Sequence, residues 1–224
     1  MRNNSLLMIE DLVNHLKNEK EDTELRQNIL ATLQHFTQRY EPINKLIELD
    51  IIKWLIDTFT YEMNTLSNYT IEFGLALLMN LSLSKNGRNK FEEDSERTIQ
   101  ILIHYLNKEN NVHIQTSING ALYSLLKKKG LREAAKKFRI EDIIQNSDIT
   151  EPTNQRQIAY ILQELREENE NILISQDIDE NFGEDPNAID EEINNVDDGY
   201  VESDSIDEKM IAIHYKSVSD YIIR

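Results

Sequence analysis

The five histidines are the side chains of this sequence best suited to acid–base or metal chemistry near neutral pH. They lie at His15, His35, His104, His113 and His214, and none has the His-x-x-x-His or His-Glu-x-x-His spacing of a helical metal site. The sequence also lacks a phosphate-binding glycine loop, a nucleophile elbow and cysteine. We therefore predict that the chain is not an enzyme and holds no cofactor or metal ion.

Acidic side chains near the carboxyl terminus raise the question of calcium binding. The segment from Asp177 to Gly183 contains parts of an EF-hand loop, which needs ligands at fixed positions, a terminal glutamate and a helix on each side. No clear entering helix precedes it. We interpret these residues as a solvated polyanion.

Basic side chains are dense in one place only, residues 127–139, where Glu133 is the single acid. The cluster consists of Lys127, Lys128, Lys129, Arg132, Lys136, Lys137 and Arg139. Two interpretations stay open: a solvated helix end favoured by the helix dipole, or a surface for an acidic partner. That partner would be the chain's own tail, a tubulin tail or an acidic patch on a scaffold. No aromatic residues are interleaved for base stacking, so we do not predict nucleic-acid binding.

Charge is unevenly distributed over the 224 residues, whose net charge is −17. Residues 169–224 hold 16 acidic and 3 basic side chains, whereas the remaining 168 residues hold 25 and 21. We predict a disordered acidic tail at 169–205 and a short docking segment at 206–224, where apolar residues return. No apolar run reaches 18 residues and no secretory signal is evident, which predicts no membrane span and a cytoplasmic or cytoskeletal location.

Repeats organise the rest of the chain. Four similar segments end at Phe36, Leu81, Leu125 and Leu165, which are 45, 44 and 40 residues apart, as in armadillo and HEAT arrays. Each ends an amphipathic helix, and a shorter apolar helix precedes each one. Short first helices at about 42–48, 86–93 and 130–138 favour armadillo units, because HEAT units have two helices.

The predicted fold is therefore all-α: an armadillo-type right-handed superhelical solenoid of about 3.7 repeats over residues 1–168, with repeats at roughly 1–39, 40–84, 85–128 and 129–168. The first repeat lacks its opening helix, so we expect Leu6, Leu7 and Ile9 to lack a cover.

Single residues refine the helix boundaries. We expect Asp50 and Asn111 to cap helices, Pro152 to open the last long helix, and Gly87 and Gly130 to end long helices in left-handed conformation. Two further glycines, Gly74 and Gly120, lie inside long helices, where they either permit close packing or open a groove for a ligand backbone.

Peptide-binding armadillo proteins carry an asparagine on the third helix of each repeat and a tryptophan one helical turn before it. Here the asparagine position has His35, Asn80, Ser124 and Glu164, and no tryptophan lies one turn earlier. We therefore predict no binding of basic nuclear-localisation peptides. Asn80 either satisfies a neighbouring backbone or contacts a ligand. The candidate partner-binding residues are His35, Arg39, Phe73, Asn80, Gly120, Ser124, Lys127, Lys128, Lys129, Arg132 and Lys136.

The stretch from Leu66 to Leu83 resembles the most recognisable part of the armadillo-repeat-containing protein nine family. Further helices of that family have similar stretches here in the same order, upstream at residues 54–57 and downstream at 119–125, 131–135 and 141–144. The likeness covers roughly residues 5–168. The LisH and coiled-coil regions of the family, which would supply dimerisation, are absent from this sequence. The oligomeric state therefore stays open.

That resemblance implies a non-catalytic scaffold of the ciliary basal body, centriole and axoneme that acts in cilium assembly and stability. It implies protein partners at the basal body and the ciliary tip, including microtubule-associated proteins such as a ciliary TOG-domain protein. The alternative is an armadillo peptide-binding adaptor in cytosolic signalling or transport. The sequence identifies neither the partner nor the surface of the solenoid that binds it.

Overall fold

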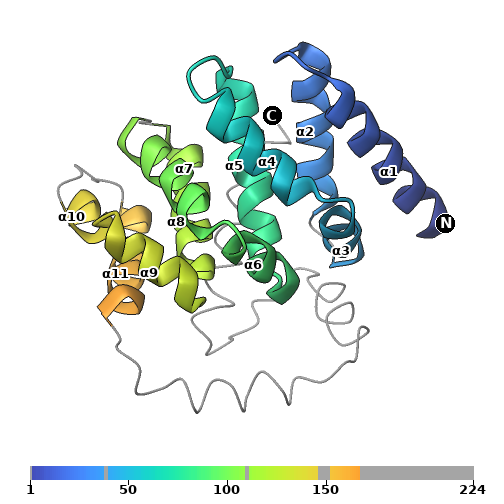
Figure 1. The fold of residues 1–224 in the computed structure, drawn as a ribbon. Helices are drawn as coiled ribbons and strands as arrows, with labels where there is room; N and C mark the ends of the chain where they lie inside the picture. The colour runs from blue at the N-terminus through green and yellow to red at the C-terminus, as the bar shows by residue number, and fades with distance from the viewer. Residues whose placement is uncertain (1, 38–39, 109–110, 146–151, 167–224) are drawn as a thin grey trace, which may run out of the picture.

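The computed structural model describes residues 2–37, 40–108, 111–145 and 152–166, and every regular element within these ranges is an α-helix (Figure 1). The helices are α1 (Arg2–Asn18), α2 (Glu24–Phe36), α3 (Tyr40–Glu48), α4 (Ile51–Tyr61), α5 (Asn68–Ser82), α6 (Lys85–Glu92), α7 (Ser95–Lys108), α8 (Val112–Leu125), α9 (Lys129–Lys137), α10 (Ile140–Gln145) and α11 (Pro152–Arg166). The predicted tail and docking segment lie outside the described residues.

The helices form a stack that runs from α1 at one end to α10 and α11 at the other (Figure 1). The long helices α2, α5, α8 and α11 pack against one another in that order, and α4 packs against α7. Each described unit after the first consists of three helices and ends in a helix of 14 or 15 residues, whereas the first described unit consists of α1 and α2. In the third unit α7 is as long as α8, and in the fourth α10 has only 6 residues. The predicted all-α armadillo fold is confirmed.

Several helices begin where a side chain satisfies a backbone N–H that has no partner in the first turn. The capping side chains are Thr23 for α2, Ser67 for α5, Ser84 for α6 and Asn111 for α8. The predicted cap at Asn111 is confirmed and Pro152 is the first residue of α11. Asp50 is a correction: its φ is 54° and its side chain makes no capping hydrogen bond. Aspartate tolerates this left-handed turn between α3 and α4.

Helix α5 is the centre of the core. Every residue from Gly74 to Ser82 is buried, because α2 covers one side of the helix and α8 the other. A helix that is apolar nearly all round is stable only when neighbours surround it. The position of the third repeat's long helix, α8, is therefore set by packing on α5.

Glycine permits close approach in this stack. A Cβ atom on Gly74 would lie 2.7 Å from Phe59 Cζ, and one on Gly120 would lie 2.7 Å from Met79 Sδ, which confirms the close-packing interpretation. The predicted helix-ending roles of Gly87 and Gly130 are wrong. Both lie within short helices, and no described glycine has a positive φ. A Cβ on Gly87 would lie 1.9 Å from the Leu81 carbonyl oxygen, so glycine is needed there for the tight α5–α6 corner.

The two kinds of glycine predict different costs of substitution. We expect Gly87→Ala to lower the free energy of unfolding by about 1–3 kcal/mol, because backbone must move to admit the methyl group. Gly120→Ala should change it by less than about 1 kcal/mol, since the flexible Met79 side chain can move and alanine favours the helix. Urea denaturation followed by circular dichroism measures both. Equal losses for the two variants would contradict this account.

Candidate partner-binding surfaces

The long helices carry the four positions that hold asparagine in peptide-binding armadillo proteins, which we call the asparagine ladder: His35, Asn80, Ser124 and Glu164. Two of these positions are buried between repeats. Asn80 is 1% exposed, and its Nδ2 donates to Thr37 Oγ1 over 2.7 Å. Ser124 is 4% exposed, and its Oγ donates to the Ser82 carbonyl oxygen over 2.6 Å. Each side chain thus links its own long helix to the end of the preceding one. A ligand could reach either side chain only after these contacts opened.

The other candidates on the long helices differ in exposure. His35 is exposed, whereas Phe73 and Gly120 are partly buried. Arg39 lies outside the described residues. The structure therefore does not bring these residues together as one open row of side chains, since its middle members, Asn80 and Ser124, are covered.

Asn119 is a buried polar residue that the repeat pattern did not single out. It is 0% exposed, and neither its Oδ1 nor its Nδ2 has a hydrogen-bond partner in the described part of the chain. Counting from the ladder positions, the equivalent residues of the two preceding repeats are Leu30 and Leu75, both buried. An amide here occupies a leucine position, and its desolvation opposes folding.

The basic cluster lies in the turn between α8 and α9, on α9 and directly after it, and we call its seven residues the α8–α9 basic surface. Three of its members form ion pairs with neighbouring acidic side chains. Lys128 pairs with Glu92 at 3.5 Å, Lys137 with Glu96 at 2.6 Å, and Arg139 with Asp142 at 2.6 Å. The partners Glu92 and Glu96 belong to the preceding repeat, so sequence proximity alone does not reveal them.

The remaining members are held by weaker or local contacts. Arg132 donates to the Leu126 carbonyl oxygen over 2.7 Å, and Lys127 Nζ lies 5.0 Å from the centre of the Tyr123 ring. Lys129 lies 3.9 Å from Glu133, and both side chains are highly exposed, at 73% and 67%. Lys136 is exposed and makes no ion pair with the described residues. Lys129 and Lys136 therefore present most of their charge to solvent.

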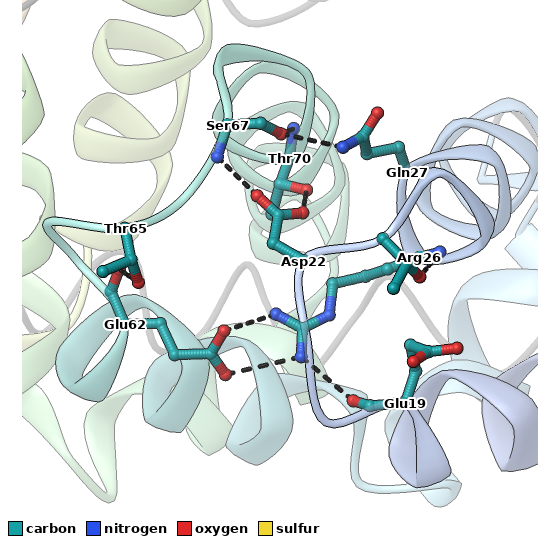
Figure 2. A network of polar contacts seen from close by, with 9 residues as sticks. Glu19, Asp22, Arg26, Gln27, Glu62, Thr65, Ser67 and Thr70 are labelled. Carbon is teal, nitrogen blue, oxygen red and sulfur yellow. Dashed lines mark hydrogen bonds and ion pairs between the residues drawn. The ribbon is translucent and has the colours of Figure 1, made fainter.

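A polar network fastens the first repeat to the second (Figure 2). Arg26 is 1% exposed, and its Nη1 donates to Glu62 Oε2 over 2.5 Å. Its Nη2 donates to the Glu19 carbonyl oxygen over 2.9 Å, and its guanidinium carbon lies 5.7 Å from the centre of the Trp54 ring. The Glu62 carboxylate and the Glu19 carbonyl oxygen thus bind the guanidinium from the second and the first repeat, respectively, and these contacts offset the cost of burying its charge.

Asp22 completes this network from the loop between α1 and α2. Its carboxylate accepts hydrogen bonds from the Ser67 backbone N–H and the Thr70 hydroxyl at the start of α5 (Figure 2). Partial burial raises the pKa of Asp22, but the bonds from Ser67 and Thr70 outweigh it, so the pKa lies below its ordinary value of 3.8. The ionised carboxylate therefore stabilises the junction of the two repeats.

The two ends of the stack differ in chemistry. At the first repeat Leu7, Met8 and Leu25 are 60%, 45% and 52% exposed. Of the three residues predicted to lack a cover, only Leu7 is exposed, whereas Leu6 is partly buried against the core and Ile9 is 0% exposed. The residues equivalent to Leu25 in the next two repeats, Thr70 and Ile114, are each 1% exposed because a preceding repeat covers them.

At the other end, α11 presents a mixed face. Ala159, Leu162, Gln163 and Arg166 line an open hollow of about 470 Å³, and Arg166 pairs with Glu141 at 2.7 Å. In the described ranges no group of three His, Cys, Asp or Glu side chains is arranged to hold a metal ion. Among the described helices, none has both the length and the apolar character needed to cross a bilayer.

Comparison with known proteins places this chain beside one family. The family model for the armadillo repeats of LisH domain-containing protein ARMC9 matches residues 46–166. LisH domain-containing protein ARMC9 of Danio rerio is 34% identical over 155 residues, which are 69% of this chain and 19% of that protein. The Homo sapiens protein is 34% identical over 167 residues (72% and 20%) and the Bos taurus protein 36% over 169 residues (73% and 24%). The chain thus spans about a fifth to a quarter of these relatives.

The Asp22 contacts predict a pH-dependent loss of stability. Because the folded pKa lies below 3.8, the stabilisation is complete well above pH 3.8 and disappears as the pH falls through the folded pKa. We expect Asp22→Asn to lower the free energy of unfolding by about 1–2 kcal/mol at pH 7 and by much less near pH 2. Denaturation at the two pH values tests this, with the exposed Asp11→Asn as control. A pH-independent difference would contradict the ionised role.

The unpartnered amide of Asn119 predicts a stabilising substitution. Asn119→Leu should raise the free energy of unfolding by about 1–3 kcal/mol, because it removes the desolvation cost of the amide. Asn80→Leu is the matched control and should not stabilise, since it leaves the buried Thr37 hydroxyl without its donor. Thermal or urea denaturation reports both changes. Destabilisation by Asn119→Leu would mean that this amide has a partner after all.

Proposed function

Because the chain belongs to the family of LisH domain-containing ARMC9 proteins, through their armadillo repeats, we propose that it is a non-catalytic protein-binding scaffold of the ciliary basal body and axoneme. In this role it acts in cilium assembly and stability. The expected locations are the cytoplasm and cytoskeleton, with enrichment at the basal body, centriole and ciliary tip. The partners are basal-body and ciliary-tip proteins, including microtubule-associated ones. The proposal carries the role of the whole family to a chain that spans only part of the length of its relatives.

The observation that carries a binding role is the exposed charge of the α8–α9 basic surface. Buried Leu131, Ala134 and Ala135 fix one side of α9 to the stack, so that Lys129 and Lys136 project from a rigid support. Exposed charge on a preorganised helix increases the rate and specificity of association with an oppositely charged partner. Acidic tails such as those of tubulin have the required chemistry.

The alternative, an adaptor that binds extended peptides along the asparagine ladder, has less support. The Asn80 Nδ2 and the Ser124 Oγ each donate a hydrogen bond to the preceding repeat, and both side chains are at most 4% exposed, although the buried Asn80 Oδ1 has no partner among the described residues. A ligand backbone would have to compete with these internal partners. No described contact favours the alternative.

The test is localisation of the tagged, full 224-residue chain in ciliated cells. We expect enrichment at the basal body, and a loss of at least about half of that enrichment for the Lys129→Glu/Lys136→Glu variant, since charge reversal repels an acidic partner. Lys20→Glu/Lys53→Glu makes the same charge change in the α1–α2 loop and on α4, and should localise normally.

Pelleting of the purified proteins with microtubules at two salt concentrations separates binding from cellular effects. Binding that depends on the α8–α9 basic surface should weaken at high salt and in the Lys129→Glu/Lys136→Glu variant. A wild-type chain that stays diffuse in ciliated cells would overturn the ciliary proposal, whatever the pelleting shows.

A further inference from the structure

We propose that the acidic segment of residues 169–208 binds the α8–α9 basic surface of its own chain. The segment begins three residues after Arg166, the last residue of α11, and contains 15 acidic and no basic side chains. This contact concerns the chain itself and does not depend on the ciliary proposal. Three observations support it: the sign of the charge on each part of the solenoid, the place where the described chain ends, and the exposure of the lysines.

The distribution of charge leaves one attractive surface for a polyanion. Residues 127–139 carry seven basic side chains and one acidic side chain, whereas the rest of residues 1–168 carry 14 basic and 24 acidic side chains. The remainder of the solenoid therefore repels the segment on average. Charges interact over about 10 Å at 0.1 M salt, so the local sign of the surface decides where an acidic chain rests.

The described chain ends close to this surface. Arg166, the last residue of α11, pairs with Glu141 of α10, and α10 packs against both α9 and α7. Figure 1 shows α9, α10 and α11 together at one end of the stack. A segment tethered there is present at an effective concentration on the order of millimolar, so weak individual contacts suffice for binding.

Some lysines of this surface have a positive charge that internal ion pairs do not neutralise and that an acidic segment can therefore bind. Ion pairs with Glu92 and Glu96 engage Lys128 and Lys137, but these pairs are on the side of α9 that faces the preceding repeat. The exposed Lys129–Glu133 pair is of the kind that contributes at most about 1 kcal/mol, so an incoming carboxylate can replace Glu133 at little cost. Lys136 has no ion pair to lose among the described residues.

The absence of cysteine makes a direct test practical. A single Ser203→Cys substitution accepts a nitroxide spin label within the acidic segment, and paramagnetic broadening of backbone amide signals then reports which helices lie near it. Ser203 is 37 residues beyond Arg166. For the disordered chain that the composition predicts, this length corresponds to a span of roughly 30–35 Å or more, so proximity to α9 would not follow from connectivity alone.

We expect selective broadening of amides in α9 and at the end of α8, with α1 and α4 unaffected, in about 0.01 M salt. The broadening should be lost in about 1 M salt, where the screening length is about 3 Å. It should weaken by at least about two-fold in Lys129→Gln/Lys136→Gln and persist in the matched Lys20→Gln/Lys53→Gln variant. Circular dichroism of each variant verifies that the helices are intact.

Two results would overturn the proposal. One is broadening that is absent, uniform over the solenoid, or insensitive to salt and to the Lys129 and Lys136 substitutions. The other is equal broadening in a mixture of spin-labelled, isotope-free chains with isotope-labelled chains that carry no spin label, because the contact would then lie between molecules.

Discussion

Stacking on a neighbour is the interaction on which this whole structure depends. No repeat can bury its apolar faces alone, and α5 shows why: it is buried on nearly every side, and the faces that bury it belong to α2 and α8 of other repeats. The free energy of folding is therefore located largely between repeats. Close approach at Gly120 is part of the same constraint, because α8 must lie directly against Met79 of the preceding repeat.

Apolar stacking does not fix the register of one repeat on the next, whereas the polar contacts do so here. Asn80 to Thr37, Ser124 to Ser82, and the Arg26 and Asp22 network each join one repeat to its neighbour through atoms with strict geometry. A buried polar group without a hydrogen-bond partner lowers stability. A shift of one repeat along its neighbour would break several of these hydrogen bonds together and is therefore disfavoured. Side chains at positions that other armadillo proteins use for ligands serve here to align the stack.

The sequence predicts the fold well because helical periodicity and a repeat of about 44 residues are local patterns. It predicts the surfaces less well, because these depend on contacts between repeats. The partners of Lys128 and Lys137 and the burial of Asn80 follow from packing between repeats, which no single repeat contains. Asn119 could have been noticed as an asparagine at a leucine position of the repeat, but its lack of partners needs the structure.

The unlike ends of the stack limit how such solenoids can associate. The first repeat offers exposed Leu7, Met8 and Leu25, while α11 offers Gln163 and Arg166 beside Ala159 and Leu162. A filament grows only when one end of a subunit complements the other end of the next. Here the apolar end would meet a polar one, and the charged Arg166 would lose its hydration. Among the described residues, such a contact would therefore carry a desolvation cost at Arg166 that opposes growth of a filament.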